Sequence, residues 1–323
     1  MANDTGPGDV PDNYRMLYGM LYISLAALPL PVYVFALYVI MKSSTFRRHM
    51  SYWIIFALGA FECVQLLGHI YLGIAVVRDD AGPKWAEKFF MAINSFTLSG
   101  AMQMTFLLSF NRLSVITDWF GAPKGFYKSY MAVSVLYVAA LVALFTTDLA
   151  GLTYYSKLLV NIYDSSYPLS GFFADLDSFF AAGCVGFSFL FYVLTVAYLV
   201  VQRFSLRTIN HGTIPKRELV ILFQGIVIFA LQMVLVMGSL PWFSFVPNVP
   251  LVYWATGAYN IFGIVAAGWV NPIMYLTMNR KLRAKIGEQF KKSVPFPTKI
   301  HSESGNPSLF HVQVPSRLSS HSS

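Results

Sequence analysis

The stretch "GWVNPIMYLTMNRKLRAKI", residues 268–286, begins as an apolar helix, carries an Asn-Pro pair, and then becomes basic. Pro272 has no backbone N–H, and it leaves the carbonyl four residues upstream without its helical bond. We therefore expect the helix to bend or loosen at this point, with Asn271 bonding the freed groups. Tyr275 lies one turn further on the same side. A proline tolerated in a membrane helix for packing alone is the alternative.

The basic part of the stretch follows a second pattern. Leu282, Ile286 and Phe290 recur every four residues, and the positions around them are filled by Arg280, Lys281, Arg283, Lys285, Lys291 and Lys292. This pattern is typical of an amphipathic helix that lies flat on a membrane surface. We expect such a helix over residues 279–291, held by anionic lipid of the inner leaflet.

The composition of the whole chain is that of a membrane protein. Of its 323 residues 56% are hydrophobic and only 12% are charged, whereas a soluble domain carries about a quarter charged residues. A membrane-spanning helix needs about 20 apolar residues. Seven runs meet this requirement: 17–41, 51–77, 89–111, 129–147, 178–202, 219–243 and 251–278.

The basic residues predict how these runs are oriented. Of the 23 Lys and Arg residues, 18 lie in the first, third and fifth connections and in the C-terminal segment. The positive-inside rule therefore places the C-terminus in the cytoplasm and the N-terminus outside. The net charge of +8 is explained by this orientation and by attraction to anionic lipid, so it requires no nucleic-acid partner.

These observations predict one domain with two short flanking segments. Residues 1–16 form the extracellular N-terminus, residues 17–291 the seven-helix domain with its amphipathic helix, and residues 292–323 a disordered cytoplasmic tail rich in Ser and Pro. Asn3 begins an N-x-T sequon on the outer side, where glycosylation is sterically allowed, although such a tripeptide also arises by chance.

The two cysteines predict that no disulfide holds the extracellular side together. Cys63 and Cys184 both lie within apolar runs, where we expect them to be packed as free thiols. The long connection over residues 148–177 then has to order itself by packing alone.

The second run holds the single charged residue found within the seven runs. Glu62, Gln65 and His69 are spaced by three and four residues, so they share one face of a helix. A carboxylate facing lipid costs about 2.5–3.5 kcal/mol on insertion scales, so this face is expected to point inward, toward polar partners or an ion. A protonated, hydrogen-bonded packing residue is the simpler interpretation of Glu62. Glu62 and His69 lie about 10 Å apart along the axis, too far to chelate one metal, and no metal site is expected.

The third run ends at a basic residue with two possible roles. Arg112 follows Asn111 at the expected cytoplasmic end, where it serves either as a positive-inside anchor or as a switch that pairs with a carboxylate at rest. Glu218, at the start of the sixth run, is the candidate partner. It is equally an acid favoured by the dipole of its own helix.

Seven helices with an external N-terminus fit a receptor bundle, a retinal protein or a sugar carrier of the three-plus-one-plus-three type. A covalently bound retinal needs a Schiff-base amine in the last helix, and no run contains Lys. For the carrier we looked for matched helix breaks between the two halves. The first run has Pro29 and Pro31 while the fifth has no proline, so no repeat is visible.

Asn271, Pro272 and Tyr275, followed by a short basic helix, resemble the N-P-x-x-Y ending of rhodopsin-type G-protein-coupled receptors. The segment "FNRLSVI" stands where such receptors carry an acidic-Arg-aromatic triplet, with Asn111 in place of the acid and Leu113 in place of the aromatic residue. The tryptophan-proline switch of their helix 6 is missing as well, since the nearest pair, Pro241 and Trp242, lies at the outer end.

With these departures, "LGAFECVQLLGHIYLGI", "LSFNRLSVI" and "NPIMYLTMNRKLR" most resemble the nematode serpentine chemoreceptors of class T, over roughly residues 15–290. The resemblance implies a seven-transmembrane chemosensory receptor of the plasma membrane that activates a heterotrimeric G protein and is not an enzyme. It also implies desensitisation through ten Ser and Thr hydroxyls of the tail, with arrestin as a partner.

The remaining expectations concern the ligand. No cofactor is expected, and the ligand is an extracellular small molecule of unknown identity. Six aromatic residues either line a mostly uncharged outer cavity, which would suit a small apolar or weakly polar molecule, or form an aromatic belt at the membrane interface: Phe89, Phe179, Phe180, Trp242, Tyr253 and Trp254. A seven-helix carrier for a small solute is the alternative function.

Overall fold

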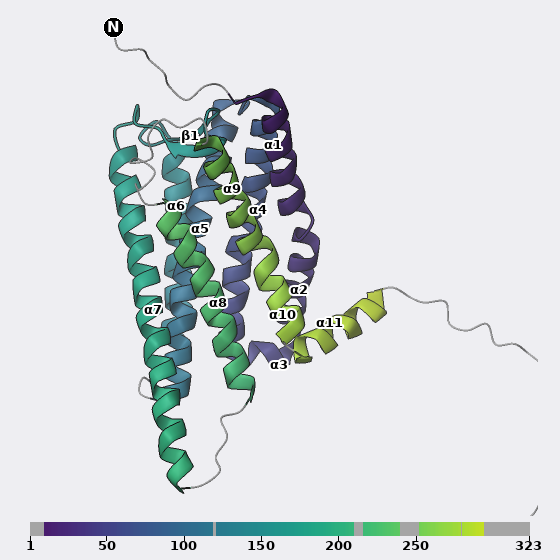
Figure 1. The fold of residues 1–323 in the computed structure, drawn as a ribbon, viewed down its shortest axis with the longest axis vertical. Helices are drawn as coiled ribbons and strands as arrows, with labels where there is room; N and C mark the ends of the chain where they lie inside the picture. The colour runs from purple at the N-terminus through teal and green to yellow at the C-terminus, as the bar shows by residue number, and fades with distance from the viewer. Residues whose placement is uncertain (1–9, 119–120, 210–215, 240–251, 279, 294–323) are drawn as a thin grey trace, which may run out of the picture.

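The computed structural model describes residues 10–118, 121–209, 216–239, 252–278 and 280–293, and its long helices run side by side as one bundle (Figure 1). The seven expected runs correspond, in chain order, to α1 (Asp12–Ala27) with α2 (Leu30–Lys42), α4 (Met50–Arg78), α5 (Lys84–Thr117), α6 (Lys124–Phe145), α7 (Ser170–Ile209), α8 (Lys216–Ser239), and α9 (Val252–Val265) with the π-helical turn η2 (Ala266–Val270) and α10 (Asn271–Met278). Short α3 (Ser44–Arg47) and α11 (Arg280–Ser293) lie at the expected cytoplasmic end (Figure 1).

Within the described ranges, four helical segments are long and apolar enough to cross a membrane: Asp12–Lys42, Met50–Arg78, Lys124–Phe145 and Ser170–Gln202. Helix α5 is not among them because it carries many polar side chains. Those side chains are buried, since α5 packs against α4, α6, α7 and α8 and meets protein rather than lipid: Asn94, Thr97, Ser99, Gln103, Thr105, Ser109, Asn111 and Arg112.

The first and fifth runs illustrate how the helices differ in extent from the sequence-based expectation. The first begins at Asp12 and is interrupted at Pro29, which has no backbone N–H to continue the ladder of α1 into α2. The fifth extends over the 40 residues of α7, about 60 Å at 1.5 Å per residue. That length is about twice the thickness of a bilayer core, and α7 projects beyond its neighbours at the lower end of Figure 1.

The connection between α6 and α7 contains a hairpin that the sequence did not predict. Strand β1 (Leu152–Tyr155) pairs antiparallel with β2 (Val160–Tyr163), and Leu152 lies opposite Tyr163. Glu87 of α5 fixes the hairpin, because its Oε1 accepts hydrogen bonds from the Thr153 hydroxyl at 2.7 Å and from the Tyr154 amide at 2.8 Å.

A second contact fixes the chain just before the hairpin. Lys88 Nζ lies 3.0 Å from Asp148 Oδ1, donates to the Thr147 carbonyl at 2.7 Å, and lies 4.1 Å from the centre of the Tyr167 ring. Cys63 and Cys184 are buried free thiols. The connection is thus ordered without a disulfide, but not by packing alone as predicted, because hydrogen bonds and an ion pair also hold it.

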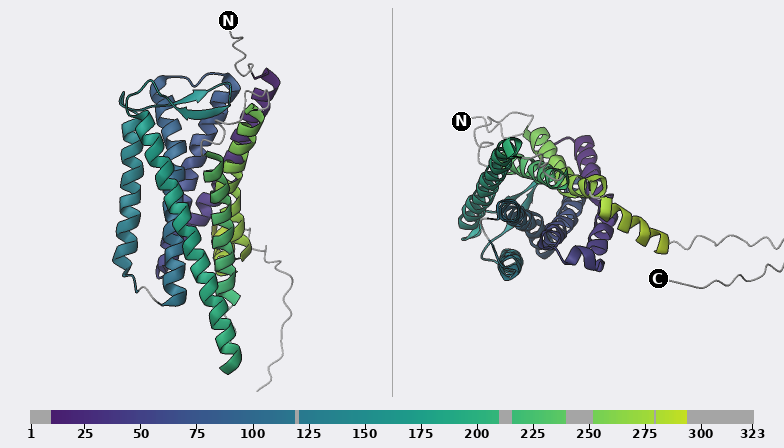
Figure 2. Two further views of the ribbon diagram at one scale, coloured as in Figure 1. Left: turned by 60° about the vertical axis from the view of Figure 1, so that its left-hand side comes forward. Right: turned by 90° about the horizontal axis from the view of Figure 1, so that it is seen from below.

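Helix α11 leaves the bundle at an angle, as Figure 2 shows from below. Leu282 is buried and packs in a core cluster with residues of α2 and α4, whereas Arg280, Lys281, Arg283 and Lys285 are exposed. The helix therefore has an apolar side and a basic side, as its sequence pattern predicted, and Leu282 on the apolar side packs against the protein; its position on a membrane surface stays a prediction.

Candidate ligand cavity and polar core

The Asn-Pro pair lies directly after the π-helical turn η2. Pro272 removes the N–H that would bond Gly268, and Gly268 is the middle residue of this turn. The helix is thus loosened where the sequence predicted, and it continues as α10 from Asn271. Trp269 donates its indole N–H to the Leu25 carbonyl of α1 at 2.9 Å, so the loosened turn is tied to a neighbouring helix.

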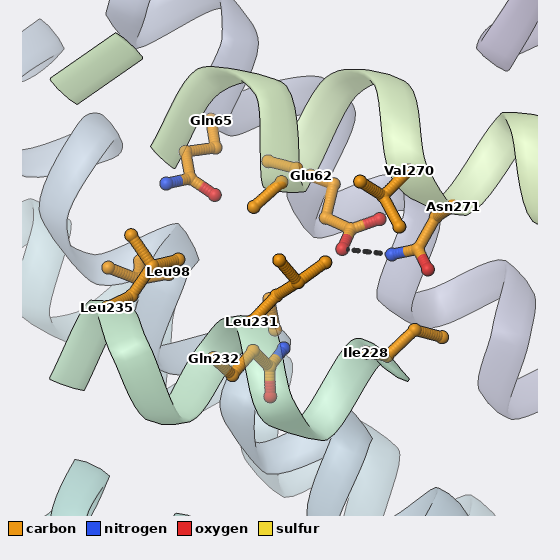
Figure 3. A pocket seen from close by; sticks show the side chains of 12 residues that line it. Glu62, Gln65, Leu98, Ile228, Leu231, Gln232, Leu235, Val270 and Asn271 are labelled. Atoms are coloured by element: carbon orange, nitrogen blue, oxygen red, sulfur yellow. Dashed lines mark hydrogen bonds between the residues drawn. The ribbon is translucent and has the colours of Figure 1, made fainter. Parts of the chain in front are cut away.

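Asn271 does not bond the backbone groups freed by the proline, which corrects the expectation for this side chain. Its Nδ2 donates instead to Glu62 Oε1 of α4 at 2.5 Å, a contact drawn as the dashed line in Figure 3. The other carboxylate oxygen of Glu62 accepts a hydrogen bond from the Tyr33 hydroxyl of α2. Glu62 is only 3% exposed, so this carboxyl group joins three helices inside the bundle.

A small internal cavity adjoins this junction. Its volume is about 20 Å³, which gives room for one water molecule. Glu62, Gln65, Gln232 and Asn271 line it together with apolar side chains, and Figure 3 shows Gln65 and Gln232 on opposite walls. The polar face of α4 predicted from spacing therefore points into the bundle.

A second cavity, of about 400 Å³, lies between the small one and the hairpin. Gln65 and His69 of α4 line its inner part, and β2 contributes Asn161 and Tyr163. Val160 and Ile162 of β2 line it as well, and the other lining residues come from α5, α7, α8 and α9: Asn94, Ser95, Leu98, Ser99, Met102, Asp177, Ser178, Ala181, Leu235, Thr256, Tyr259, Asn260 and Gly263. This cavity is large enough for a small organic ligand, and more than half of its lining side chains are polar.

Five of the six aromatic residues considered for the ligand site are described, and none of these five lines this cavity. Phe179 is 79% exposed, and Phe89, Phe180 and Trp254 are exposed to a lesser degree on the outside of the bundle. Tyr253 packs against Tyr14, while Trp242 lies outside the described residues. The outward positions are those of an interfacial belt, where an aromatic ring faces lipid and headgroups.

At the opposite end of α5, Asn111 and Arg112 are buried. Asn111 Oδ1 accepts a hydrogen bond from the Ser51 hydroxyl of α4 at 2.7 Å. Arg112 is 6% exposed, and its charge acts electrostatically on the buried Tyr192 of α7. The guanidinium therefore lies among helices, whereas a side chain that serves only as a topology anchor is expected to extend toward the headgroups.

Several other expectations concern residues that the structure does not describe. Asn3 and the tail over residues 294–323 lie outside the described residues, as do the side chains of Glu218 and Tyr275, whose helices α8 and α10 are described. The pairing of Arg112 with Glu218 therefore stays a prediction. Among the described residues no group of three His, Cys, Asp or Glu side chains could hold a metal ion.

No protein-family model matches the chain, and no curated protein matches it in sequence. Its structure is nevertheless similar to solved structures, among them the crystal structure of squid rhodopsin. The TM-score is 0.70 at 15% sequence identity, and the match covers 88% of each chain. At this identity the similarity establishes the fold: the chain is an all-α membrane protein with a rhodopsin-like helix bundle, as the sequence predicted. The resemblance to class T nematode receptors stays a prediction.

Proposed function

We propose that this chain is a G-protein-coupled chemosensory receptor. An extracellular small molecule binds in the 400 Å³ cavity, and the bundle then activates a heterotrimeric G protein at its cytoplasmic end. The proposed receptor acts through a conformational change and is not itself an enzyme. The rhodopsin-like fold supports it.

One observation carries the proposal: buried polar groups form a path from the cavity to the loosened turn of the last helix. Gln65 lines both cavities, and one turn further along α4 Glu62 binds Asn271. A ligand that changes the position of Gln65 thereby acts on Glu62 and on the π-helical turn before Pro272. A π-helical turn beside a proline is a place where a helix changes conformation at low cost.

The cytoplasmic end supplies the proposed output. Arg112 is buried beside Tyr192 of α7, in the helix that also lines the ligand cavity. We infer that activation exposes this guanidinium to the G protein, with Asn111 and Glu218 holding the resting arrangement. Pro272 and Tyr275 allow α10 to move at the same end of the bundle.

The proposed placement in the cell follows the charge distribution. The receptor lies in the plasma membrane with its N-terminus outside, and Asn3 is a candidate glycosylation site there. The exposed basic residues of α11 bind anionic lipid of the inner leaflet. Phosphorylated Ser and Thr residues of the tail recruit arrestin.

The test reconstitutes the full chain into lipid vesicles with a promiscuous heterotrimeric G protein. A panel of small molecules should contain at least one that accelerates nucleotide exchange by wild-type protein and not by Arg112→Gln protein at equal density. Solute flux is measured in the same vesicles without the G protein. Flux that depends on a panel compound, with no effect on nucleotide exchange, would identify a carrier and exclude the receptor.

A further inference from the structure

The outer cavity has one acidic lining residue among those that the structure describes. Among the described residues around it, Asp177 is the only acid, and none is Lys or Arg. Asp177 lies near the start of α7, beside the hairpin, at the outer part of the cavity. The described lining thus offers an acidic side chain without a Lys or Arg beside it.

The contacts of Asp177 leave room for a ligand. Its Oδ1 accepts a hydrogen bond from the Ser99 hydroxyl of α5 at 2.5 Å, and its Oδ2 accepts one from the Tyr163 hydroxyl of β2 at 3.4 Å. Burial raises the pKa of Tyr163 well above its usual value, so this hydroxyl keeps its proton. A carboxylate accepts about four hydrogen bonds, and the two described contacts hold its orientation while further lone pairs face the cavity.

The inner part of the same cavity carries polar atoms that lack partners. Within the described structure, Gln65 Oε1, Asn94 Oδ1 and both ring nitrogens of His69 are buried without a hydrogen bond. All three side chains line the cavity, and each is at least 95% buried. Polar groups buried in this way require partners, so an apolar occupant would leave them unsatisfied.

We propose that the ligand is a small protonated amine that also carries a hydrogen-bonding group. The ammonium binds Asp177, and the second polar group reaches Gln65, Asn94 or His69. This inference rests on the proposed receptor function and specifies the chemistry of its ligand. It replaces the apolar or weakly polar ligand that the aromatic residues of the sequence suggested.

Charge distinguishes this proposal from a purely structural role of Asp177. An asparagine could hold both neighbours, since its Oδ1 would accept from Ser99 while its NH₂ group would donate to the Tyr163 hydroxyl oxygen, without the cost of removing a full charge from water. A carboxylate becomes favourable when a cation arrives to form a charge-assisted hydrogen bond. An anionic ligand, in contrast, would be repelled by Asp177 and would find no Lys or Arg among the described lining residues.

The experiment measures binding to the purified full chain in detergent, without a G protein. The probes are tyramine and cadaverine, which carry a second polar group, each beside the neutral alcohol of the same skeleton: tyrosol and 1,5-pentanediol. At least one amine should raise the thermal transition and bind at least about 30-fold more tightly than its alcohol. Loss of one partner of a buried charge pair costs about 2 kcal/mol or more, and about 1.4 kcal/mol corresponds to tenfold.

Asp177→Asn should abolish this preference for the amine, and Asp175→Asn is the matched control. Asp175 lies on the same helix two residues earlier, is exposed, and does not line the cavity. Its variant should bind the amine as the wild type does. The comparison of amine with alcohol on the wild-type chain keeps the test valid even where Asp177→Asn protein does not fold.

Three outcomes would overturn the inference: no amine binds, the alcohols bind as well as the amines, or folded Asp177→Asn protein keeps the preference. Other outcomes test the proposed receptor function independently of the amine site. An amine that binds through Asp177 without accelerating nucleotide exchange supports the site and contradicts the receptor. Neutral or anionic compounds that accelerate exchange, while amines do not bind, support the receptor and contradict the amine.

Discussion

The carboxyl group of Glu62 is expected to hold three helices together by hydrogen bonding rather than by charge. It accepts from Tyr33 and from Asn271, at 2.5 Å in the second case, and is almost completely buried. Glu62→Ala removes the acceptor atoms of both hydrogen bonds. Glu62→Gln keeps the shape: its amide oxygen accepts from Asn271, while its NH₂ group donates to the oxygen of Tyr33.

The expected magnitudes follow from the number of bonds lost. Hydrogen bonds between membrane helices contribute on average about 0.6 kcal/mol each and at most about 1.7 kcal/mol. Two lost bonds therefore lower the free energy of unfolding of Glu62→Ala by about 1–3 kcal/mol, and the space left by the side chain adds to this. Glu62→Gln should stay within about 0.5 kcal/mol of the wild type, since both bonds are re-formed.

Reversible unfolding of the full chain in mixed micelles, followed by helical circular dichroism, measures these differences. Tyr33→Phe serves as the control, because it removes one donor and leaves the bond to Asn271 intact. Its loss of stability should be smaller than that of Glu62→Ala. A Glu62→Gln variant as unstable as Glu62→Ala would refute the reasoning, because the negative charge itself would then be required.

Three further predictions concern signalling, packing and topology. Arg112→Gln and Arg112→Lys should both bind ligand but promote nucleotide exchange at least about tenfold more slowly than the wild type, since neither restores the planar guanidinium. Normal nucleotide exchange by Arg112→Gln protein at equal density would show that Arg112 is only a topology anchor. Gly68→Ala should destabilise the bundle by about 1–3 kcal/mol in thermal unfolding, because the added Cβ would lie 2.9 Å from a backbone atom of α5. Gly183→Ala is the control and should leave the stability unchanged, because its added Cβ would have no neighbouring atom within 4 Å. Antibodies against tags at Ala2 and Ser323 should reach only the first in intact cells, and access to the second would reverse the orientation.

The sequence determined those features of the protein that depend on near neighbours in the chain. The spacing of Glu62, Gln65 and His69 places them on one side of a helix whatever surrounds it, and that side points inward in the structure. The break before Pro272 follows from the covalent structure of proline, and the structure has a π-helical turn there. Likewise, the period of four in residues 282–290 predicted the amphipathic helix.

Tertiary structure alone decided which distant residues meet. Ser99 and Asp177 are 78 positions apart, and Asn271 meets Glu62 across 209 positions. No periodicity connects such pairs, so the sequence assigned Asn271 to its own backbone and treated Asp177 as the end of a connection. The aromatic residues could not be assigned either, because a ring at a membrane interface and a ring in a ligand pocket occupy the same kind of sequence position. Hydrophobic periodicity along a helix determines which of its sides is buried. The residues that this side contacts depend on how the helices of the bundle pack together. That packing placed the side chain of Asp177 in the lining of a polar cavity.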